Sequence, residues 1–173
     1  DVRTWDLTKI AQAVRYHYFM SLTNQHITKS KTISSFSEIV SYAYGTSEIQ
    51  PTLFDFLAHR ALNFTMYSSF PVPGPAEIFA IDDEAYFGSN STFLSIKPQT
   101  KDSLNTSFYA VQIFQELTRF HQEENNLPAL FSVELERLRH MSYKSSLPNK
   151  DDLYYNSLHR LIRVYHDIPY VSE

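Results

Sequence analysis

Apolar residues at helical spacing are the feature that most limits how this chain can fold. Over residues 7–24, apolar side chains recur every three or four positions. The same spacing returns in residues 35–43, 51–67, 106–124, 128–141 and 149–168. This spacing puts one apolar stripe along each helix, so we expect about six helices that pack through these stripes.

Capping residues support several of these helix ends. Asp6 stands where an N-cap should precede the first helix, and Ser35 with Glu38 forms a capping box for the second. Gly45 would end that second helix. The third helix, 51–67, leaves only a narrow polar edge, which predicts that it is the most buried helix.

The middle of the chain departs from this pattern. Residues 70–75 (Phe-Pro-Val-Pro-Gly-Pro) cannot continue a helix and predict a stiff connector. Residues 77–81 and 92–96, with polar residues between them, predict an antiparallel β-hairpin. Residues 27–33 are rich in β-branched side chains and predict a short strand or an extended linker.

These elements together predict a mainly α, α+β fold. We expect a single domain over residues 1–173, with about six helices in two three-helix groups and the connector and hairpin between them. The N-terminal half, 1–98, holds helices and the hairpin, and 104–173 forms a three-helix unit whose short joints favour antiparallel neighbours. The element order over residues 6–97 matches a winged-helix domain, so a winged-helix-like N-terminal half is an alternative.

Composition removes several classes of function. The chain has no cysteine, which excludes a disulfide framework, a thiolate metal site and a cysteine nucleophile. Its three glycines are isolated, so there is no glycine-rich nucleotide loop, and no serine lies in a Gly-x-Ser-x-Gly elbow. We therefore expect no cofactor.

No apolar run approaches the length of a membrane span, and the first residues do not form a signal peptide. Together with the absence of cysteine, this favours an intracellular location, nuclear or cytoplasmic, without membrane insertion. The net charge of −4 makes a nucleic acid the weaker of the partners considered.

Three clusters could carry chemistry, and each has a plainer explanation. His121 and Glu124 could share a metal, but a site needs further ligands, so a solvated helix end is favoured. Asp55 could orient His59 as a general base, but without a recognisable nucleophile a helix-surface pair is favoured. The acidic run 82–84 could bind Ca²⁺ or a basic partner, but it lacks spaced oxygen ligands, which favours a solvated turn.

The aromatic content points to an interface. The chain has 13 Phe, 12 Tyr and one Trp against 3 Gly, and aromatic side chains suit surfaces that pack against a partner. On the last helix, arginines at helical spacing could clamp a carboxylate or phosphate, while Leu158, Leu161 and Ile162 face the core. The candidate partner-binding residues are Tyr16 and Met20 on the first helix, Phe79, Tyr86, Phe87 and Phe93 on the hairpin, and His159, Arg160 and Arg163 on the last helix.

These observations predict a non-catalytic protein-interaction or scaffold domain of a larger intracellular protein or complex. The first alternative is a winged-helix nucleic-acid-binding domain, although its third helix would offer few cations to phosphates. The second alternative is a small helical enzyme or ligand-binding bundle. An internal cavity lined by His17, Tyr18 or His59, with strongly shifted protonation of these groups, would favour that alternative.

Overall fold

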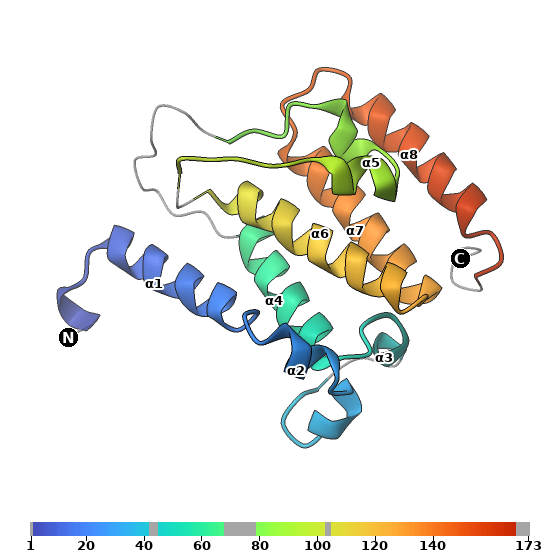
Figure 1. Ribbon diagram of the computed structural model, residues 1–173. Coiled ribbons are helices and arrows are strands. Elements are labelled where there is room, and N and C mark those ends of the chain that lie inside the picture. The colour runs from blue at the N-terminus through green and yellow to red at the C-terminus, as the bar shows by residue number, and fades with distance from the viewer. Residues whose placement is uncertain (1, 42–44, 68–78, 103–104, 169–173) are drawn as a thin grey trace. The chain divides into compact units, whose positions relative to one another are not determined.

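The structure is a computed structural model that describes residues 2–41, 45–67, 79–102 and 105–168. These residues form eight α-helices and three short 3-10 helices, and none of them belongs to a β-strand longer than an isolated bridge (Figure 1). The prediction of a mainly helical chain is therefore confirmed in its helical part, and the predicted α+β class is wrong.

The chain divides into two compact units. The first consists of Asp1–Phe79 with Thr100–Ala110, and the second of Ala80–Gln99 with Val111–Glu173. One long helix contributes its first residues to the first unit and the remainder to the second. The single domain over residues 1–173 stays a prediction.

The first unit contains several helices of different length. They are η1 (Val2–Thr4), α1 (Leu7–Met20), α2 (Gln25–Lys29), η2 (Ile33–Phe36), α3 (Thr46–Ile49), α4 (Leu53–Tyr67) and the start of α6 (Thr106–Glu123). α1 begins where the sequence predicts, because the Asp6 carboxylate accepts a hydrogen bond from the Lys9 backbone N–H at 2.7 Å. α4 packs against both α1 and α2, and its buried side chains include Phe54, Ala58 and Leu62.

A capping box fixes the start of α4. The backbone N–H and the hydroxyl of Thr52 both donate to the Asp55 carboxylate, at 2.9 and 2.8 Å, and the Asp55 N–H donates back to the Thr52 hydroxyl. Thr52 also forms an isolated antiparallel bridge with Thr32. The predicted strand over 27–33 shrinks to this bridge, because α2 extends to Lys29.

The second predicted helix, 35–43, is only partly present. Of its described residues only Ser35 and Phe36 are helical, in the 3-10 helix η2, and residues 37–41 form a turn and irregular chain. Residues 42–44 lie outside the described part of the chain. Gly45 has φ 81°, the left-handed conformation that glycine adopts without strain, but it precedes α3 rather than ending a longer helix.

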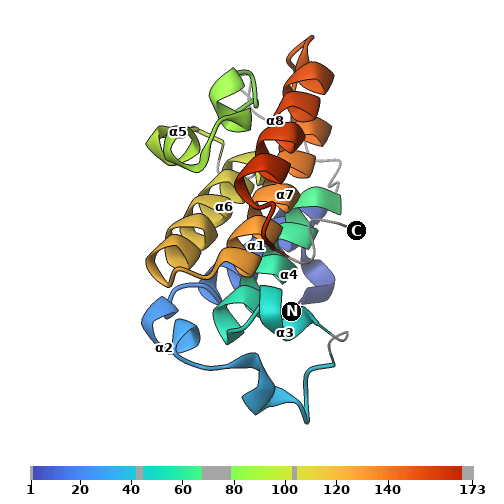
Figure 2. The same cartoon turned by 90° about the vertical axis from the view of Figure 1, so that its right-hand side faces the viewer.

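The second unit contains η3 (Glu84–Phe87), α5 (Asn90–Ser95), the remainder of α6, α7 (Leu127–Lys144) and α8 (Lys150–Val164). α7 and α8 lie side by side, and η3 packs against both of them (Figures 1 and 2). The buried core of the second unit includes Phe87, Phe93, Phe114 and Leu138. The three long helices predicted for the C-terminal half are all present.

The predicted hairpin is wrong, and with it the winged-helix alternative. Where the second strand was expected, Ser89 caps α5 by accepting from the Thr92 N–H at 3.3 Å. Asp83 caps η3 in the same way, accepting from the Ala85 N–H at 2.8 Å. The predicted connector 70–75 and residues 77–78 of the first strand lie outside the described residues.

Side chains from the helices take the place of strand pairing. Backbone carbonyls in residues 81–96 accept hydrogen bonds from Ser145, Gln115, Arg137, Ser157 and Arg160. A buried carbonyl needs a partner, and a hairpin would have supplied it from the opposite strand. Here the partners come from α6, α7, α8 and the residue that follows α7.

Candidate functional site

The predicted partner-binding residues of α1 lie at the surface of the first unit. Tyr16 is 58% exposed and Met20 is 45% exposed, one helical turn apart. Phe79, predicted on the hairpin, is half-buried and meets the ring of Phe108 edge-to-face at 5.7 Å. Only Tyr16 and Met20 of these three therefore offer a substantial side-chain surface.

The other three residues predicted on the hairpin are core residues of the second unit. Tyr86, Phe87 and Phe93 are each exposed by 5% or less. Burial, with a smaller contribution from nearby Asp82 and Asp83, raises the pKa of Tyr86 to about 12. These rings form the interior of the second unit and offer no contact surface in this structure.

The three predicted cations of the last helix have different surroundings. Arg160 is half-buried and donates to the carbonyl oxygens of Phe87 and Gly88, at 2.8 and 3.0 Å. His159 and Arg163 are exposed. Arg160 therefore holds the segment before α5, whereas the other two are available at the surface.

Two exposed apolar residues join His159 and Arg163 on one side of α8. Tyr155 is 62% exposed and Ile162 is 52% exposed. The rings of Tyr155 and His159 meet edge-to-face, with centroids 4.4 Å apart. We call these four residues, Tyr155, His159, Ile162 and Arg163, the α8 outer face.

Sequence reasoning placed Ile162 in the core, and the structure corrects this. Ile162 lies seven residues after Tyr155, so the two share a helix face together with His159. The buried side of α8 instead uses Leu161 and Ser157, together with the following Tyr165. The spacing of Tyr155, His159 and Ile162 was the signal that could have identified this face.

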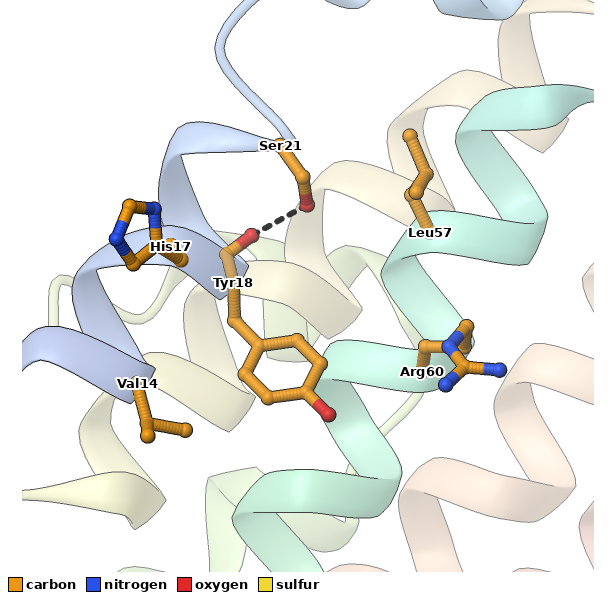
Figure 3. A pocket seen from close by; sticks show the side chains of 6 residues that line it. All are labelled: Val14, His17, Tyr18, Ser21, Leu57 and Arg60. Atoms are coloured by element: carbon orange, nitrogen blue, oxygen red, sulfur yellow. Dashed lines mark hydrogen bonds between the residues drawn. The ribbon is translucent and has the colours of Figure 1, made fainter. Parts of the chain in front are cut away.

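A pocket of about 410 Å³ lies between α1 and α4 in the first unit (Figure 3). Its mainly apolar lining consists of Val14, His17 and Tyr18 from α1, of Ser21 directly after α1, and of Leu57 and Arg60 from α4. The Tyr18 ring extends from α1 toward α4, where it stacks on Phe64 with centroids 4.7 Å apart. Two residues that the sequence suggested for a cavity, His17 and Tyr18, thus line one, and His59 does not.

The two histidine pairs considered for chemistry differ in burial from what the sequence predicts. His121 is 1% exposed whereas Glu124 is exposed, so the predicted solvated helix end is wrong for the histidine. Asp55 and His59 are both buried, and the Asp55 carboxylate is bonded to Thr52 in the capping box. The predicted helix-surface pair is therefore wrong as well.

The acidic run 82–84 is exposed and serves local structure. Asp83 caps η3, and Glu84 accepts a hydrogen bond from the Asn149 side chain at 2.8 Å. Among the residues that the structure describes, no group of three or more His, Asp or Glu side chains is placed to hold a metal ion.

Within the described ranges, no helix has both the length and the apolar character needed to cross a membrane. No protein-family model matches this sequence, and neither a curated protein nor a solved structure matches it. A functional proposal for this chain therefore has only its own surfaces and pocket to rest on.

Proposed function

We propose that this chain is a non-catalytic protein-interaction domain of a larger intracellular protein, and that the α8 outer face contacts the partner. The observation that carries this proposal is the joint exposure of Tyr155 and Ile162, at 62% and 52%, on one side of a helix. Single exposed apolar residues are ordinary on a protein surface. An aligned pair beside a histidine and an arginine has the composition of an interface centre, where tyrosine and arginine are enriched.

The chemistry of this face defines what its partner should present. Tyr155 and Ile162 need an apolar surface to cover them, and Arg163 needs an acceptor. Among the residues that the structure describes, the Arg163 side chain donates a single long bond of 3.4 Å, to the His159 carbonyl oxygen. A carboxylate at the rim of an apolar patch would satisfy these requirements together.

Site-specific photocrosslinking tests the proposal. A photoreactive phenylalanine analogue replaces Tyr155 in the full-length protein, which is expressed in its native cells and irradiated. We expect one defined adduct, because a real interface holds one partner against this position. Tyr143 on α7 is the matched control, since it is an aromatic residue with 68% exposure outside the α8 outer face. The same adduct pattern from both positions, or no adduct from position 155, would contradict the proposal.

Substitution of the face provides a second measurement. Tyr155→Ser with Ile162→Ser should weaken binding of the crosslinked partner at least tenfold, because truncation of central interface residues removes most of the binding energy. Both residues are exposed, so circular dichroism should show an unchanged fold. Tyr143→Ser should leave the affinity unchanged. An equal loss of affinity in the double variant and in Tyr143→Ser would indicate a general effect of surface polarity and would contradict the assignment to this face.

A further inference from the structure

We propose that the pocket between α1 and α4 binds a small organic monocarboxylate with an apolar body, such as a medium-chain fatty acid. This inference goes beyond the proposed interaction and is independent of it, since the pocket residues belong to the first unit and the α8 outer face to the second. Three features of the pocket support this inference: its volume, the restraint on its Tyr18 ring and the charge of its lining.

The volume suits a small molecule. Pockets that bind small ligands usually measure roughly 300–1,000 Å³ and have mainly apolar walls with a few polar groups. The volume here is about 410 Å³, and apolar walls come from Val14, Leu57 and the Tyr18 ring. A body of about ten carbons would remove these walls from water, with a gain that grows with the area buried.

Two contacts restrain Tyr18, one of the lining residues. Tyr18 stacks nearly parallel on Phe64, with an interplanar angle of 20°. The Ser21 hydroxyl donates to the Tyr18 carbonyl oxygen at 2.6 Å, as the dashed line in Figure 3 shows. These contacts restrain the Tyr18 ring and the chain at the end of α1, which lowers the cost of ordering this wall when a ligand binds.

The charge of the lining selects an anion. Arg60 is exposed, its guanidinium lies 5.5 Å from the centre of the Phe56 ring, and it forms no ion pair with any carboxylate of the described residues. α1 carries Lys9, Arg15 and His17 but no acidic residue. The one acid of α4, Asp55, is buried in the capping box.

An anion for Arg60 must therefore come from outside this pair of helices. A guanidinium binds a carboxylate through two parallel hydrogen bonds. A single arginine beside apolar walls matches one negative charge better than the two of a phosphate monoester. The Tyr18 hydroxyl, which has no hydrogen-bond partner among the described residues, adds a donor on the α1 side.

Calorimetric titration of the full chain with decanoate, below its micelle concentration, tests the inference. We expect saturable one-to-one binding, and shifts of the Val14 and Leu57 methyl resonances should place the ligand in the pocket. Decanol, which has the same body without the charge, should bind several-fold more weakly because it cannot pair with Arg60. Absence of saturable decanoate binding, or equal affinity for decanol, would overturn the inference.

Three variants assign the binding to this pocket. Arg60→Gln should weaken decanoate about tenfold and leave decanol unchanged, because only the ionic contact is removed. Leu57→Trp should weaken both ligands by filling the space. Lys31→Gln, a cation of the same unit that does not line the pocket, should change neither. Equal weakening of decanoate by Lys31→Gln and Arg60→Gln would show general charge attraction and overturn the inference.

Discussion

Arg137 carries its charge inside the second unit, where it has no exposed surface. Its guanidinium donates to the carbonyl oxygens of Tyr86 and Gly88, at 2.6 and 3.0 Å, and lies 4.4 Å from the centre of the Phe93 ring. Burial lowers the pKa of Arg137 to about 10, an effect that the nearby Glu134 carboxylate partly opposes. The residue is therefore still protonated at neutral pH, and it joins α7 to the segment that precedes α5.

Replacing Arg137 should be costly, because its loss removes the side-chain donor to the Tyr86 carbonyl, one of the two donors to the Gly88 carbonyl and a cation beside the buried Glu134. We expect Arg137→Met to lower the free energy of unfolding by about 3–5 kcal/mol, measured by urea unfolding followed by circular dichroism. Arg119→Met is the matched control, since the Arg119–Glu116 pair is about 40% exposed and should contribute less than about 1 kcal/mol. A similar loss in both variants would argue against a structural role for the buried arginine.

His140 is a second buried polar residue, with 1% exposure and an edge-to-face contact with Phe114. Its Nε2 atom has no hydrogen-bond partner within the described part of the chain. Burial lowers its pKa from 6.5 to about 4, with a smaller lowering by Lys144 and an opposing contribution from Glu136. His140 is therefore neutral in the folded protein over a pH range in which the unfolded chain takes up a proton.

Acid should destabilise the protein through this residue. Between pH 6.5 and about pH 4 the unfolded state binds the His140 proton and the folded state does not, so stability falls as the pH falls. The full contribution is about 3 kcal/mol. His140→Gln should flatten the dependence of the unfolding free energy on pH in this window, whereas His26→Gln, at an exposed position, should not. An unchanged pH dependence in His140→Gln would refute the assignment.

The short elements η3 and α5 show how local capping can override strand propensity. Asp83 and Ser89 each start a helical turn, and Gly88 lies between the two turns with its carbonyl oxygen bonded to both Arg137 and Arg160. A Cβ atom on Gly88 would lie 2.7 Å from the Thr92 Cγ2 atom and 3.0 Å from the Ala85 carbonyl oxygen. Glycine is needed here because two chain segments approach closely, and not because of an unusual φ angle.

The close packing of Gly88 against Thr92 can be tested by substitution. Gly88→Ala should lower the free energy of unfolding by about 1–3 kcal/mol, as expected for an overpacked site. Thr92→Ser in the same chain removes the nearest atom and should restore part of the loss, although the Thr92 Cβ contact at 2.8 Å remains. A double-mutant cycle by thermal or urea unfolding measures this coupling. Additive effects of the two substitutions would mean that the contact is not the cause.

At the scale of the whole molecule, the net negative charge argues against DNA as a partner. The net charge of −4 opposes attraction to a phosphate backbone, and the predicted wing is absent from the described residues. We expect no measurable affinity for a random DNA duplex at low salt by fluorescence anisotropy. DNA binding that weakens steeply with added salt would contradict this expectation. Lys29 and Lys31 in the first unit would then be the candidate contacts to phosphate.

Helical periodicity by itself determined most of the long helices. An apolar stripe or a helix cap depends only on residues within one or two helical turns, so both can be recognised in the sequence. This holds for the stripes of α1, α4, α6, α7 and α8 and for the Asp6 cap.

Tertiary structure decided the remainder. Residues 92–96 have strand-like composition, but residues 92–95 belong to α5. Backbone carbonyls within residues 86–96 accept hydrogen bonds from Gln115, Arg137 and Arg160 on distant helices. These donors lie 19 to 73 positions away in sequence, so no local pattern could reveal them. The burial of Tyr86 and Phe93 also depends on contacts between residues far apart in sequence. So does the pocket, which forms where α1 packs against α4. Periodicity shows which side of a helix is apolar, but only the fold decides whether that side is covered, open or facing a cavity.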